Sequence, residues 1–132
     1  MSGSVIHNKH YSPEEARILL HDIRVKINTL VALKKHLDEI NYNIYKHEYF
    51  GGLGPNGSKF HPEELMTLVD ILRSLEKQGV IIKSIDEGLI DFPAIRANGE
   101  EVYLCWKLGE EDIFYWHTIR DGFQGRRPLS AF

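Results

Sequence analysis

Cysteine and long hydrophobic runs are both scarce in this sequence. Its 132 residues include one cysteine, Cys105, which has no partner within the chain for a disulfide bond; this suits a reducing compartment. No apolar run approaches the ~18 residues that a membrane span needs. Residues 1–10 are polar and lack the hydrophobic centre of a signal peptide. We therefore expect a cytoplasmic protein with no membrane partner.

An excess of charge of one sign is also missing. The formal net charge is −3, so no global field attracts nucleic acid, and we expect no nucleic-acid partner. None of the seven histidines stands four residues from another, which excludes the helical two-histidine zinc motif. The G-x-G-x-x-G pattern at residues 52–57 follows a predicted helix and not a strand, so it does not indicate a dinucleotide site. No cofactor is predicted.

The first half of the chain has the periodicity of helices. The motif Ser-Pro-Glu-Glu at residues 12–15 is a capping box, and apolar residues follow it at spacings of three and four. This pattern predicts one long helix over residues 13–49. A glycine-rich loop at 51–58 and a second helix over 62–79 come next. We expect the two helices to form an antiparallel helical hairpin, residues 12–79.

The two predicted helices differ in length. At ~1.5 Å per residue the first would be about twice as long as the second. Its apolar stripe is also wide, because Leu20, Val31 and Tyr45 extend it. A helix from a second copy would cover the excess, so we predict a homodimer through the long helix. The alternative is a kinked monomer that covers its own stripe.

Residues 80–118 have the composition of an antiparallel sheet. Strands are expected wherever β-branched and aromatic residues cluster between turn signals. The chain as a whole, 1–132, is then a single α+β domain in which a three- to four-stranded antiparallel sheet follows the hairpin. Residues 119–132 form an irregular tail. The predicted strands cover residues 80–85, 89–96, 101–108 and 113–118.

Two turns set the expected register of this sheet. Asn98-Gly99 is a strong signal for a two-residue hairpin turn, which places Asp91 opposite Trp106. A tight turn at Glu110-Glu111 then places Trp106 opposite Tyr115. Side chains alternate across a sheet, and the helices are expected to cover the more aliphatic face. On that face we expect Asp91, Trp106, Tyr115 and His117.

The other predicted face is unusually aromatic. Contiguous exposed aromatic side chains mark a contact surface, although the tail or a partner subunit would also bury such a face. This face would carry Phe92, Tyr103, Cys105, Phe114 and Trp116.

A polar centre is predicted around Asp91. A buried carboxylate is costly unless it is paired and hydrogen-bonded, and Arg126 and Arg127 in the tail are the expected partners. One interpretation is a structural ion pair that fixes the tail to the sheet. The other is a polar pocket walled by Trp106 and Tyr115, in which an arginine holds an anion.

Several short sequence motifs that resemble those of a known family occur together. They are YSPEEA at 11–16, DEGLIDFPA at 86–94, EVYLCWKLGE at 101–110, YWH at 115–117 and GFQGRRPL at 122–129. This set is similar to the family called domain of unknown function 2203. The resemblance implies a small prokaryotic protein without an assigned activity, and it supplies neither a substrate nor a catalytic residue.

Three functions fit these observations. The favoured one is a dimeric, non-catalytic binding or assembly module with a polar centre near Asp91, His117 and Arg126, and with a small anion as a possible ligand. The second is an enzyme that uses His117 and Asp91 as acid and base. The third is a divalent-metal site made by His117, Asp91 and either Asp121 or Glu87. No residue is assigned a catalytic role.

Overall fold

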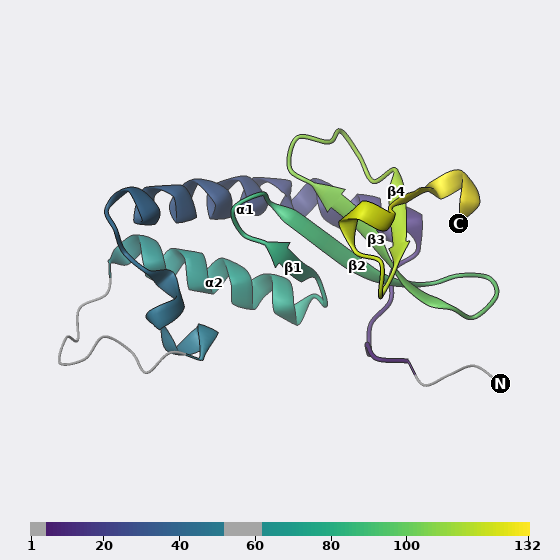
Figure 1. Ribbon diagram of the computed structural model, residues 1–132, viewed down its shortest axis with the longest axis horizontal. Coiled ribbons are helices and arrows are strands. Elements are labelled where there is room, and N and C mark those ends of the chain that lie inside the picture. Colours follow the sequence, from purple (N-terminus) through teal and green to yellow (C-terminus); the bar gives the residue numbers. More distant parts are fainter. Residues whose placement is uncertain (1–4, 52–61) are drawn as a thin grey trace.

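The computed structural model describes residues 5–51 and 62–132 and has two helices followed by a five-stranded antiparallel sheet (Figure 1). The α+β class is therefore confirmed. The G-x-G-x-x-G pattern lies outside the described residues. The helices are α1 (Pro13–Glu39) and α2 (Glu63–Lys77), and the strands are β1 (Ile81–Ser84), β2 (Leu89–Ile95), β3 (Glu101–Lys107), β4 (Tyr115–Thr118) and β5 (Arg127–Pro128). Short 3₁₀ helices are η1 (Ile44–Lys46), η2 (Glu48–Phe50), η3 (Phe123–Gly125) and η4 (Leu129–Ala131).

Helix α1 begins where the sequence predicts and ends earlier. The Ser12 hydroxyl accepts from the Glu15 amide at 3.1 Å, and the Glu15 carboxylate accepts from the Ser12 amide at 2.9 Å, so the capping box is present. The predicted continuation to Tyr49 is wrong, because the helix stops at Glu39. Asn41 adopts a left-handed conformation with φ of 59°. Asparagine tolerates this conformation, which ends a helix much as glycine does.

The apolar stripe of α1 is buried along its length within one chain. Its first half packs in a cluster with the sheet, and its second half packs in a cluster with α2. The centre of the stripe is therefore covered within the chain, whereas Tyr45, which was counted in its excess, is 52% exposed, and the homodimer stays a prediction. Full burial of an aliphatic side chain stabilises the fold by roughly 1.5–3 kcal/mol. The stripe residues with 1% exposure or less are Ala16, Leu20, Ile23, Ile27, Leu30 and Leu37.

The sheet has one strand more than expected. Its order is β1-β2-β3-β4-β5, and every neighbouring pair is antiparallel. The added strand, β5, comes from the tail that the sequence predicts to be irregular; Arg127 pairs with Trp116, whose indole N–H donates to the Pro128 carbonyl at 3.1 Å. The tail is thus fastened to the sheet edge.

The loop between β2 and β3 is one residue longer than a two-residue turn. The Gly99 amide donates to the Arg96 carbonyl, and the Arg96 amide donates to the Glu100 carbonyl, both at 2.8 Å. Gly99 has φ of +87°, so the loop is a turn closed by a left-handed glycine, a common three-residue hairpin. The predicted register is consequently wrong by one residue, and Asp91 lies opposite Cys105.

The connection between β3 and β4 is also wider than the predicted tight turn. Cys105 lies opposite Tyr115, and Tyr103 lies opposite His117. This second pairing also differs by one residue from the prediction. The two errors cancel between β2 and β4, so Asp91 and His117 do share a face. On β3, however, Cys105 lies on the same face as these two residues, in place of the predicted Trp106.

The two faces of the sheet are consequently composed differently from the prediction. Helix α1 packs on the face that contains Phe92 and Trp116, which the sequence assigned to the aromatic contact face. Trp106 lies in this core with 0% exposure, and its indole N–H donates to the Glu110 carbonyl at 3.0 Å. The inner face consists of Ile90, Phe92, Ala94, Val102, Leu104, Trp106 and Trp116.

Candidate functional site

Three chemically reactive side chains meet on the outer face of the sheet. Asp91 of β2, Cys105 of β3 and His117 of β4 have exposures of 0%, 1% and 2%. One ligand-type atom from each lies within 4.8 Å of the others. The sequence predicted that Asp91 and His117 share a face and missed Cys105. A three-residue loop before β3 would have predicted it, since that loop exchanges the faces of β3.

His117 is hydrogen-bonded through both ring nitrogens. Nε2 lies 3.0 and 3.1 Å from the two carboxylate oxygens of Asp91, and Nδ1 lies 2.7 Å from the Thr118 carbonyl oxygen. Both partners accept hydrogen bonds, so both nitrogens carry protons. Burial lowers the pKa of His117, but the hydrogen bonds to Asp91 and Thr118 outweigh it and raise the pKa above its usual value. The result is a buried ion pair that joins β2 to β4.

Cys105 completes the set of donors around the carboxylate. Burial, followed by the charge of Asp91 and a hydrogen bond to it, raises the pKa of the Cys105 thiol. The thiol therefore keeps its proton. Nucleophilic catalysis by cysteine requires a base that removes this proton, and His117 has no free lone pair to accept it. The three residues form a satisfied cluster in this state.

Lys83 and Tyr103 surround the cluster. The Lys83 ammonium lies 4.0 Å from an Asp91 oxygen and 4.9 Å from the centre of the Tyr103 ring. The Tyr103 hydroxyl bonds His7 Nε2 at 2.7 Å. Burial first, then the charges of Asp91 and Glu101, raise the pKa of Tyr103. Positive and aromatic groups thus enclose the buried carboxylate.

The segment before α1 lies along this outer face. The Glu101 carboxylate accepts from the amides of Ile6 and His7 at 2.7 and 3.0 Å and bonds His10 Nε2 at 2.7 Å. The Tyr11 amide donates to the Pro93 carbonyl at 2.7 Å. These bonds hold residues 6–11 to the sheet.

The two arginines of the tail bind elsewhere than predicted. One Arg126 nitrogen lies 2.8 Å from both carboxylate oxygens of Glu110, and its guanidinium stacks on Tyr115 at 4.0 Å from the ring centre. Arg127 approaches Asp121 at 3.8 Å, where both side chains are about half exposed. Within the described residues neither arginine pairs with the buried carboxylate. The expected aspartate–arginine pair is therefore absent, and Trp106 walls no polar pocket.

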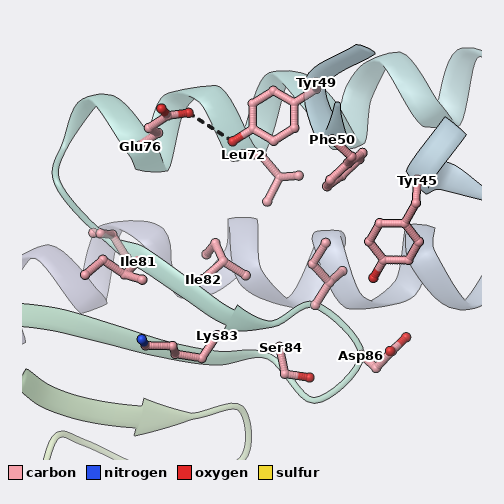
Figure 2. A pocket seen from close by; sticks show the side chains of 12 residues that line it. Tyr45, Tyr49, Phe50, Leu72, Glu76, Ile81, Ile82, Lys83, Ser84 and Asp86 are labelled. Carbon is pink, nitrogen blue, oxygen red and sulfur yellow. Dashed lines mark hydrogen bonds between the residues drawn. The ribbon is translucent and has the colours of Figure 1, made fainter. Parts of the chain in front are cut away.

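A groove that the sequence does not reveal lies beside β1 (Figure 2). Its volume is about 550 Å³. Helix α2 forms one wall, the segment from η1 to η2 another, and β1 with the turn that follows it the third. Its position depends on the chain after α1 folding back toward β1, which no local pattern encodes. The lining residues are Tyr45, Tyr49, Phe50, Leu72, Glu76 and 80–86.

The groove combines an apolar floor with acidic groups. In Figure 2 the Tyr49 hydroxyl points to Glu76, to which it donates at 3.0 Å. Burial and this hydrogen bond raise the pKa of Tyr49. Asp86 carries the second carboxylate and accepts from Lys34 at 2.9 Å. Tyr45 is 52% exposed at the mouth of the groove, so an aromatic surface is open to a ligand.

The fold and these two sites define a small α+β protein that has a buried Asp–Cys–His cluster and an open groove at one sheet edge. The chain belongs to the family described as "Uncharacterized conserved protein (DUF2203)", whose match covers residues 9–129. The resemblance seen in the sequence words is thereby confirmed. No curated protein and no solved structure matches the chain. Among the described residues no helix has the length and apolarity to cross a membrane.

Proposed function

We propose that this protein is a non-catalytic binding module that receives an extended peptide segment along the free edge of β1. The observation that carries the proposal is the groove of about 550 Å³ beside an edge strand. An extended peptide that adds to a sheet edge gains affinity from main-chain hydrogen bonds and specificity from side-chain pockets. The groove would supply such a pocket.

The edge of β1 is open to pairing. Within the described residues β1 pairs with β2 alone, and Ile81 and Ile82 are only partly buried. Proteins usually protect a sheet edge with proline, an outward charge or a covering element. β1 has no proline, and its one charged residue, Lys83, lies over Tyr103 on the outer face. The strand is four residues long, and its pairing with β2 is irregular between Ile82 and Ser84, so a further strand would pair over a short stretch and depend on the groove for much of its affinity.

The lining of the groove selects the partner's chemistry. Leu72, Ile82 and Phe50 offer apolar surface to one buried side chain of the peptide. At the rim Asp86 is already paired with Lys34 at 2.9 Å, and Lys83 adds a positive charge on the β1 side. The Glu76 carboxylate is therefore the group that favours a lysine or arginine near the apolar residue. We therefore propose a basic, apolar peptide as the ligand.

The buried cluster supports a non-catalytic role. Asp91 and His117 already satisfy each other, so the acid–base alternative would require their ion pair to open first. Arg126 is held by Glu110, which makes an anion site there a weaker proposal than the groove. The homodimer, the helical hairpin of residues 12–79 and a cytoplasmic location also stay proposals, and light scattering across a concentration series tests the first.

The experiment is a selection of displayed random peptides on the purified full chain, followed by calorimetry with the selected synthetic peptide. Tyr45→Ala and Phe50→Ala should each weaken binding at least about tenfold, which corresponds to ~1.4 kcal/mol. Phe114→Ala, an aromatic residue with 44% exposure outside the groove, is the matched control. Peptide binding should also slow amide exchange in β1. Unchanged affinity in both groove variants, or no selected peptide, would contradict the proposal.

A further inference from the structure

We infer that Asp91, Cys105 and His117 form a binding site for a borderline-soft divalent cation such as Zn²⁺. The three side chains supply an oxygen, a sulfur and a nitrogen, which is a ligand set that zinc accepts. They stand on three consecutive strands and are at most 2% exposed. This site lies outside the peptide groove, with Lys83 as the residue that borders both, and neither proposal needs the other.

The distances are close to those of a metal site. Zinc ligands at ~2.0–2.3 Å from the metal lie roughly 3.3–3.7 Å from one another in a tetrahedral arrangement. Here His117 Nε2 is 3.0 and 3.1 Å from the Asp91 oxygens, and the atoms of the whole group lie within 4.8 Å of one another. Asp91 and Cys105 are directly opposed in the sheet. Side-chain adjustments of about 1 Å therefore suffice to place all three around one ion.

Metal binding at the trio would exchange protons for the ion. Cysteine binds a metal as its thiolate, and histidine binds it through a ring nitrogen that carries no proton. A cation held by the trio would therefore replace one proton on His117 Nε2 and one on Cys105 Sγ, and both protons would leave to solvent.

The neighbours of the cluster fit this exchange in one respect and oppose it in another. His117 Nδ1 donates to the Thr118 carbonyl at 2.7 Å, the outer contact that orients a ligating histidine and leaves Nε2 for the metal. Lys83, at 4.0 Å from Asp91, repels a cation. Its side chain is 41% exposed and can turn toward solvent. Removing its charge, as in Lys83→Met, should therefore tighten metal binding.

The test uses Co²⁺ as a spectroscopic substitute for Zn²⁺. Reduced full-length protein is titrated with Co²⁺, both as folded and after refolding in its presence, because the site is buried. We expect one equivalent to bind, with a thiolate-to-cobalt absorption band in the near ultraviolet and release of two protons. Cys105→Ser should abolish the band and weaken binding by more than the ~100-fold that loss of an outer contact costs. His10→Ala, on the same face but outside the trio, is the control and should leave the band unchanged.

Two results would overturn the inference. One is the absence of a thiolate band in the wild type after refolding with Co²⁺. The other is a Co²⁺ affinity that Cys105→Ser leaves unaltered, which would assign the metal to histidines of the terminal segment. Circular dichroism of Cys105→Ser verifies that the variant folds, which is the expected outcome because the serine hydroxyl can donate to Asp91 as the thiol does. A failed peptide selection would leave these measurements unaffected.

Discussion

The two faces of the sheet are buried in different ways. The inner face is filled by apolar side chains under α1, and its stability comes from area and close packing. The outer face encloses a carboxylate, a thiol and an imidazolium beneath residues 6–11 and Lys83. An apolar core tolerates exchange of one hydrophobic residue for another. A buried polar cluster stabilises the fold only when every partner is present. The stability of the outer face therefore depends on the identity of each residue, and that of the inner face depends on the volume its side chains fill.

The largest effect is expected on the inner face. Trp106→Ala removes a fully buried indole and leaves a cavity, which should lower the free energy of unfolding by ~3–5 kcal/mol. Urea denaturation followed by circular dichroism measures it. The control Phe114→Ala removes an aromatic ring that is 44% exposed, and its cost should stay within about 0.5 kcal/mol. Equal losses of unfolding free energy in the two variants would contradict the distinction between the packed inner face and the exposed surface.

The next effect belongs to the outer face. Asp91→Asn leaves a buried imidazolium without its counter-charge and should cost ~3 kcal/mol in metal-free buffer. The double variant with His117→Gln should cost clearly less than the sum of the single variants, because the two residues act as a pair. Asp121→Asn, which breaks only the exposed contact with Arg127, should cost ~0–1 kcal/mol. Additive costs at Asp91 and His117 would refute the ion pair.

A smaller effect is expected where the terminal segment meets the sheet. Glu101→Gln weakens the acceptor of the Ile6 and His7 amides and should lower stability by ~1–2 kcal/mol. Amide exchange at these two residues should become faster, while exchange in β2 should change little. Uniform acceleration across the sheet would instead indicate that the segment is part of the global core.

The smallest expected effect is the part of the pH dependence of stability that comes from Glu101. Burial raises the pKa of Glu101, but the amide of Ile6, then His10 and the amide of His7, outweigh it and hold the pKa below the ordinary 4.5. The folded state therefore favours the ionised form. This contribution is complete above pH 4.5 and is lost as the pH falls through the folded pKa. The slope of stability against pH in this range should be shallower in Glu101→Gln, and identical slopes would contradict the assignment.

Much of the fold follows from local chemistry. The capping box at Ser12, the two helices and the presence of a hairpin at Asn98-Gly99 were predictable because each depends on neighbouring residues, whereas the length of that hairpin loop was predicted wrongly. The end of α1 was not, since Asn41 has the left-handed conformation that the sequence signals most strongly with glycine. The groove also escaped prediction, because it arises from three segments that are distant in sequence.

The candidate site was predicted in part for a geometric reason. Asp91 and His117 were placed together because two register errors of one residue cancelled between β2 and β4. Cys105 was missed because those errors do not cancel on β3. The partner of Arg126 was missed as well, since Glu110 reaches it from a loop whose width the sequence leaves undetermined.

The three-residue loop between β2 and β3 has a consequence for homologous and engineered chains. Because faces alternate along a strand, moving the β2–β3 pairing by one residue would turn the Cys105 thiol toward the helices and bring the Trp106 ring beside Asp91. Every residue of the cluster would still be present in such a chain, yet its sulfur would be on the wrong side of the sheet. The residue pair that closes this loop, Arg96 with Glu100, is therefore a diagnostic character: a family member that keeps all three cluster residues but pairs β2 with β3 one position away should be read as lacking the site.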